Sequence, residues 1–306
     1  MIILGLSFFI YHRFISFLDI LIKYEMVYTL LGMSEQTLQN ESITRKPCAF
    51  EKRIHEIDFI RGLLIGLVVM DHLFCFLMIF SQGWKGGAGI YKVTSFYWNH
   101  DVRQIVRFLA LIGFCFVSGV STAFSKNNWI RAAQMLAIAA ILAVVSNLGT
   151  LFLAKPLNLN TLSINFNIIA VLAWSTLFYC FFQKGGWRVV IIGVLVMFLL
   201  SWFLYPHLVS YVEEKELVVH IPALFRPTYP DSNADWLPLF PFIFFFFAGA
   251  YFSELFYLPG RKSLIKKRGN WERPLCFMGR HSLIIYGVHV IVIIGVLSLL
   301  NIFLGK

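Results

Sequence analysis

Charged residues are scarce in this chain, and its cysteines follow no recognisable pattern. Only 14% of the 306 residues are charged, whereas 58% are hydrophobic. A soluble domain of this length could not bury so much apolar surface. The five cysteines have neither disulfide nor zinc-binding spacing. The composition therefore excludes an ordinary soluble enzyme and indicates an integral membrane protein.

Long hydrophobic runs make up most of the chain. Several approach the roughly 20 residues that a helix needs to cross a bilayer. They lie at about 57–80, 105–124, 130–153, 164–182, 187–205, 237–258 and 280–303. The aromatic run at 244–247 is assigned to lipid-facing surface. The predicted fold class is all-α, a polytopic membrane helix bundle with about seven core transmembrane helices.

Basic residues gather in alternate connections between these runs, and the loop at 259–274 is the richest in them. The loop at 206–236 carries most of the acidic residues found between runs. By the positive-inside rule, the basic segments face the cytoplasm, which predicts a multi-pass protein of the cell membrane. Because the same loops account for most of the net charge of +10, no nucleic-acid partner is expected.

The first 50 residues are interpreted as a leader, and residues 51–306 as the membrane domain. Residues 1–32 are apolar enough for an extra helix, but charged residues interrupt them, and no signal-peptide cleavage site follows. Two interpretations stay open. Residues 1–32 are either a genuine additional helix or a segment upstream of a start at Met33.

The first hydrophobic run of the membrane domain carries ionisable side chains, which are costly at membrane depth unless they are paired or functional. Asp58 and Arg61 are three residues apart, and His72 follows Arg61 by eleven, so all three project from one side of a helix. Asp71 adds a second charge beside His72. The pattern predicts a reactive helix face; a purely structural Asp58–Arg61 ion pair is the alternative.

Two further runs carry polar groups. In the last run, Ser282, Tyr286 and His289 share one helix face. His289 should reach the depth of His72, because both helices start on the same side. Arg280 stands at the expected start of this helix, where backbone N–H groups favour anions. In the second run, small residues around Ser121 form a notch for close helix packing or for a ligand.

Four stretches together resemble the heparan-alpha-glucosaminide N-acetyltransferase catalytic-domain family, which includes bacterial proteins once called a domain of unknown function. The resemblance covers about 52–303. The spacing from Arg61 to His72 is also similar to the Arg-x10-His signature of the broader transmembrane acyltransferase superfamily. The four stretches are 53–62 with Asp71-His72, 116–121, 235–241 and 279–289.

This resemblance implies transfer of an acetyl or other short acyl group from cytoplasmic acyl-CoA to a hydroxyl or amine of a sugar or envelope glycan. It implies His72 as general base, Asp58 and Arg61 on the donor side, and Tyr286 and His289 as oxyanion or proton partners. No metal and no permanently bound cofactor is expected, and homo-oligomerisation stays open. The substrate-binding candidates are Ser282, Arg280, Ser121, Asp235 and His100.

Other interpretations of the same residues are kept. Animal relatives are described with their active histidine in the outer loop after the first span, where this chain has His100. A transporter or flippase could use Asp58, Arg61 and His72 as a proton relay or substrate site, although no internal repeat and no matched pair of broken helices supports it. A catalytically silent membrane scaffold is the third class.

Overall fold

The computed structural model of the protein describes residues 54–154, 163–164, 166–207, 236–257 and 270–305. The predicted leader at 1–50, the optional helix at 1–32 and the candidate Asp235 lie outside the described residues. So do most of the two loops that carry the topology signal, 206–236 and 259–274.

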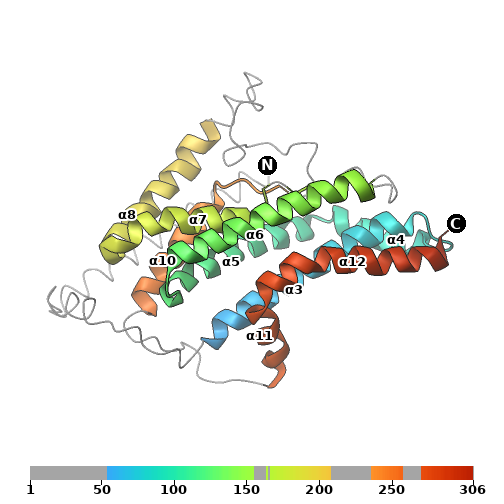
Figure 1. Ribbon diagram of the computed structural model, residues 1–306, viewed down its shortest axis with the longest axis horizontal. Coiled ribbons are helices and arrows are strands. Elements are labelled where there is room, and N and C mark those ends of the chain that lie inside the picture. The colour runs from blue at the N-terminus through green and yellow to red at the C-terminus, as the bar shows by residue number, and fades with distance from the viewer. Residues whose placement is uncertain (1–53, 155–162, 165, 208–235, 258–269, 306) are drawn as a thin grey trace. The chain divides into compact units, whose positions relative to one another are not determined.

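The described chain is helical and forms the polytopic membrane bundle predicted from hydropathy (Figure 1). Six helical segments are long and apolar enough to cross a membrane. Short 3-10 or π-helical turns extend several of the long helices at their carboxyl ends. The long helices are α3 (His55–Ser81), α5 (Asp101–Val120), α6 (Asn128–Gly149), α7 (Ile168–Phe182), α8 (Gly186–Leu199), α10 (Phe242–Phe256) and α12 (Ser282–Leu304).

Helix α10 is shorter than the apolar run that contains it. The apolar run covers 237–258, whereas the helix has 15 residues and starts after Pro241. Proline lacks a backbone N–H and disfavours helical geometry in the residue before it, so Pro238 and Pro241 delay the start. At 1.5 Å per residue α10 is roughly 22 Å long, less than the hydrocarbon core.

The assignment of the aromatic run in α10 to lipid-facing surface is wrong. The Phe246 and Phe247 side chains are both 0% exposed, and Phe244 is also buried. Helix α10 packs against α5, α7 and α8, so protein rather than lipid covers these rings. A short apolar helix can occupy the interior of a membrane bundle because its neighbours complete the span.

Glycine allows α5 and α10 to cross closely. A Cβ atom added to Gly119 would lie 1.9 Å from the Phe246 carbonyl oxygen, and one added to Gly249 would lie 2.0 Å from that of Phe116. Each helix thus presents a glycine to the backbone of the other, as small residues do at close membrane-helix contacts. The predicted notch therefore serves packing along this side of α5.

Helix α3 contacts four other helices: α5, α12 and two short ones that hydropathy did not predict, α4 (Ala88–Asn99) and α11 (Arg273–Arg280). The side chain of Trp84, which follows α3, donates a 2.9 Å hydrogen bond to Asn301 near the end of α12. The two helices therefore run parallel. Their starting end is called the α11 end here, and their finishing end the α4 end.

Candidate functional site

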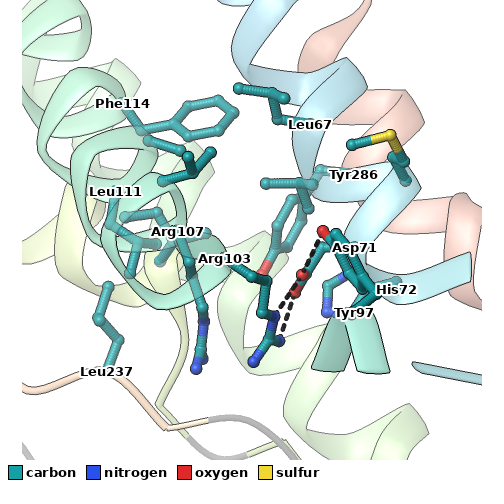
Figure 2. A pocket seen from close by; sticks show the side chains of 15 residues that line it. Leu67, Asp71, His72, Tyr97, Arg103, Arg107, Leu111, Phe114, Leu237 and Tyr286 are labelled. Atoms are coloured by element: carbon teal, nitrogen blue, oxygen red, sulfur yellow. Dashed lines mark hydrogen bonds and ion pairs between the residues drawn. The ribbon is translucent and has the colours of Figure 1, made fainter. Parts of the chain in front are cut away.

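A cavity lies between α3 and α5, with residues of α4 and α12 at its sides (Figure 2). Its water-accessible volume is about 70 Å³. Polar and apolar side chains occupy different parts of it. The lining residues are Leu67, Val68, Met70, Asp71, His72, Tyr97, Arg103, Val106, Arg107, Ala110, Leu111, Phe114, Ile168, Leu237 and Tyr286.

An ion pair between Asp71 and Arg103 anchors the polar part of the cavity. The Nε and Nη2 atoms of Arg103 donate to the two carboxylate oxygens across 2.7 and 2.8 Å, the bidentate geometry that makes such pairs strong. The Arg103 guanidinium also lies 3.5 Å from the centre of the Trp98 ring, within cation–π range. The pair joins α3 to α5 and offsets the burial of both charges.

The phenol of Tyr97 completes this cluster. Its hydroxyl donates a 3.1 Å hydrogen bond to Oδ1 of Asp71. Burial, and then the charge of Asp71, raise the pKa of Tyr97 above its usual value, because both disfavour a phenolate. The hydroxyl therefore stays protonated at neutral pH and remains a hydrogen-bond donor beside the cavity.

His72 and His289 form a hydrogen-bonded pair at the same depth. Nδ1 of His289 lies 2.7 and 3.2 Å from the carbonyl oxygens of Tyr286 and Ile285. Carbonyls only accept, so this nitrogen carries the proton. In the neutral ring, Nε2 of His289 then accepts, and Nδ1 of His72 donates to it across 2.7 Å. The tautomer assigned from these partners places the lone pair of His72 on Nε2.

The three predicted residues of helix α12 lie in different positions with respect to the cavity. Tyr286 lines the cavity together with His72, and its ring centre lies 5.5 Å from that of His289. His289 is buried and contacts the cavity through His72. Ser282 begins the helix one turn before Tyr286 and is not among the cavity-lining residues.

The apolar part of the cavity lies on its α11 side. Leu67 and Phe114 stand away from the Asp71–Arg103 pair in Figure 2. Both also pack against a buried apolar cluster that includes Ile57, Leu64 and Val117. This cluster separates the cavity from the polar residues at the α11 end.

Asp58 and Arg61 lie at the α11 end, outside the cavity lining. Asp58 forms an ion pair with Arg280 across 3.3 Å, and Arg61 donates to the hydroxyl of Ser121. Arg61 and His72 are eleven residues apart, or roughly 16 Å along the helix axis. The predicted catalytic residues therefore form two groups, and Asp58 and Arg61 lie apart from His72 and Tyr286.

The expected position of Arg280 at the start of the last helix is wrong. Arg280 is the last residue of α11, and α12 begins at Ser282. The preceding Gly279 has a packing reason instead: a Cβ there would lie 1.7 Å from the Asp58 carbonyl oxygen. Glycine thus lets α11 contact the start of α3, and this contact places Arg280 beside Asp58.

His100 lies at the start of α5, outside the cavity lining. Its side chain is exposed, and its Nδ1 accepts a 3.2 Å hydrogen bond from the backbone N–H of Val102. It therefore caps the helix, a role that polar side chains commonly fill at this position.

Sequence reasoning missed the partners of Asp71. Arg103 and Arg107 stand four residues apart at the start of an apolar run, and both line the cavity. Two arginines in an apolar run are costly at membrane depth, so their presence could have predicted a carboxylate or another acceptor nearby. Tyr97 and Trp98 lie just before the predicted His100 and contact Asp71 and Arg103 respectively.

The helices and the cavity define a multi-pass membrane protein with an internal polar site built around a histidine pair. The chain belongs to the family described as heparan-alpha-glucosaminide N-acetyltransferase, catalytic, whose model matches residues 53–291. Membership implies acetyltransferase activity in general. Searches among curated proteins and among solved structures found no significant match.

Proposed function

We propose that this protein transfers an acetyl or other short acyl group from acyl-CoA to a hydroxyl or amine of a sugar or envelope glycan. The observation that carries the proposal is the hydrogen bond between His72 and His289 at the cavity. A general base must hold its lone pair toward the acceptor, and a fixed tautomer supplies that orientation. Family membership supports the reaction class.

His72 is the proposed general base. Its Nε2 takes the proton from the acceptor hydroxyl or amine while the acceptor oxygen or nitrogen bonds to the thioester carbonyl carbon. The tetrahedral intermediate then breaks its C–S bond. The CoA thiolate leaves and takes the proton from the His72 imidazolium. The acceptor gains the acyl group, and His72 returns to its neutral form.

The tetrahedral intermediate carries an oxyanion that needs donors close by. Tyr286 lines the cavity from the same helix as His289 and is the proposed hydroxyl donor. Arg107 also lines the cavity, one helical turn from Arg103, and supplies positive charge on the opposite wall. Asp71 and Tyr97 are assigned a positioning role, because they hold Arg103 in place.

The proposed routes follow the predicted topology. Acyl-CoA approaches from the cytoplasm at the α11 end, where Arg61 and Arg280 lie, and the acceptor approaches from the α4 end. The roughly 16 Å between Arg61 and His72 suits a donor whose charged part stays at one end of the bundle while its thioester reaches the other.

Purified protein and radiolabelled acetyl-CoA test the proposal. Label should appear in a glycan acceptor with wild-type protein and should be lost with His72→Ala. Acyl-CoA binding without transfer to any acceptor would favour a scaffold. Transmembrane movement of a solute without transfer would favour a transporter.

A further inference from the structure

We propose that the apolar part of the cavity holds the acyl chain of the donor and sets its length. The residues assigned to this acyl site are Leu67, Ala110, Leu111 and Phe114. The inference rests on the proposed function and adds the residues that determine donor specificity.

The distribution of polar groups along the cavity carries the argument. Asp71, Tyr97 and Arg103 cluster at one part of the lining, with His72 nearby. Arg107 and Tyr286 also line the cavity and are assigned to the oxyanion. The four residues of the acyl site are apolar and offer no side-chain hydrogen-bond partner. A sugar ring buried among them would lose its hydrogen bonds to water without replacement, which is costly. An alkyl chain has no such cost and gains from leaving water.

The size of the cavity limits what enters. The cavity is partly open and has a water-accessible volume of about 70 Å³, so a short acyl group fits within it. Phe114 closes the cavity toward the buried apolar cluster, which it contacts. Ala110 is buried and has the smallest side chain in the acyl site. Phe114 and Ala110 are therefore the residues that we assign to setting the length of chain that fits.

Donor competition among acetyl-, propionyl- and butyryl-CoA tests this inference. Phe114→Ala enlarges the site and should raise the ratio of kcat/KM for butyryl-CoA over acetyl-CoA by about 10- to 100-fold, the usual discrimination per methylene in an apolar pocket. Ala110→Val adds two methyl groups and should lower the propionyl-to-acetyl ratio by about 10-fold.

Leu109→Ala is the matched control, because Leu109 lies on the same helix but is 57% exposed and outside the cavity lining. It should leave both ratios unchanged. If Phe114→Ala does not fold, judged by its melting temperature in detergent, Phe114→Leu makes a smaller enlargement at the same position.

Unchanged donor ratios in variants that still transfer acetyl groups would overturn the acyl site and leave the proposed function standing. Transfer from none of the three donors by the wild-type protein would overturn the proposed function and this inference with it.

Discussion

His72 and His289 are 217 residues apart in the chain, yet Nδ1 of the first lies 2.7 Å from Nε2 of the second. The contact exists because α3 and α12 run parallel and side by side. Two backbone carbonyls hold the outer nitrogen of His289, so the pair has a defined direction. His289 receives the hydrogen bond, and His72 presents its basic nitrogen.

Replacing His72 should separate catalysis from binding. If Nε2 of His72 removes the acceptor proton, His72→Ala should lower kcat by a factor on the order of 10² to 10⁴ and leave acyl-CoA binding nearly unchanged. Steady-state kinetics and equilibrium binding of acetyl-CoA to the same preparation measure the two effects.

His100 is the rival base, and His100→Asn is the sharpest variant at that position. Asparagine is a good helix cap, so this change removes the imidazole and keeps a side chain that can accept the hydrogen bond from Val102. We expect turnover within about twofold of wild type. A collapse of turnover with His100→Asn, together with survival of His72→Ala, would mean that the outer-loop histidine is the base.

The role assigned to His289 can be tested by substitutions that keep or remove its acceptor. The amide oxygen of His289→Gln can still accept from His72, whereas His289→Ala removes the acceptor. A lost hydrogen bond is worth about 1 kcal/mol, roughly a fivefold change in rate, and free rotation of His72 adds to it. Turnover should therefore fall at least about fivefold further in the alanine variant. Its pH–rate profile should also shift, which a purely structural role would not cause.

Hydropathy predicted the bundle because the long helices are continuous apolar runs. It missed α4 and α11 because they are too short to span a bilayer and mix polar with apolar residues. The apolar run starts before α10 because apolar composition continues through Pro238 and Pro241, whereas the helix begins only after them. The burial of its phenylalanines depends on neighbouring helices, which composition alone does not specify.

Periodicity predicted part of the candidate site. His72, Tyr286 and His289 were grouped correctly in space because their depths follow from counting residues along two helices that start at one end. Asp58 and Arg61 were grouped with them because they share a face of α3. One face of a long helix meets different neighbours at different depths, so direction alone could not assign them to Arg280 and Ser121.

Removing one partner of the Asp71–Arg103 pair should destabilise the fold. Asp71→Asn leaves Arg103 as a charge with only 4% of its side chain exposed, and such a loss typically costs about 3–5 kcal/mol. The double variant Asp71→Asn/Arg103→Gln removes both charges and should be less destabilised than the sum of the single changes. Melting temperatures in one detergent give the comparison, and strict additivity would contradict a direct pairing.

The predicted topology can be tested by single cysteines in the two loops. Glu214→Cys belongs to the acidic loop at 206–236 and should react with a membrane-impermeant maleimide in sealed cells. Lys262→Cys belongs to the basic loop at 259–274 and should react only after permeabilisation, because positive-inside loops face the cytoplasm. The reverse pattern would invert the orientation and the proposed routes of donor and acceptor.

Replacing a glycine at the α5–α10 crossing by alanine should destabilise the fold. In Gly119→Ala the new methyl group would lie 1.9 Å from the Phe246 carbonyl oxygen, so the two backbones must separate at an estimated cost of about 1–3 kcal/mol. Gly295→Ala is the matched control, because, apart from its own stretch of helix, no atom of the part of the chain that the structure describes lies within 4 Å of its added Cβ. Alanine forms helix better than glycine by about 1 kcal/mol, so this control should melt at the same temperature or higher. Gly119 lies near the end of α5 and Gly295 within α12. Equal melting temperatures for both variants would contradict the close crossing, because the Phe246 contact should make only Gly119→Ala costly.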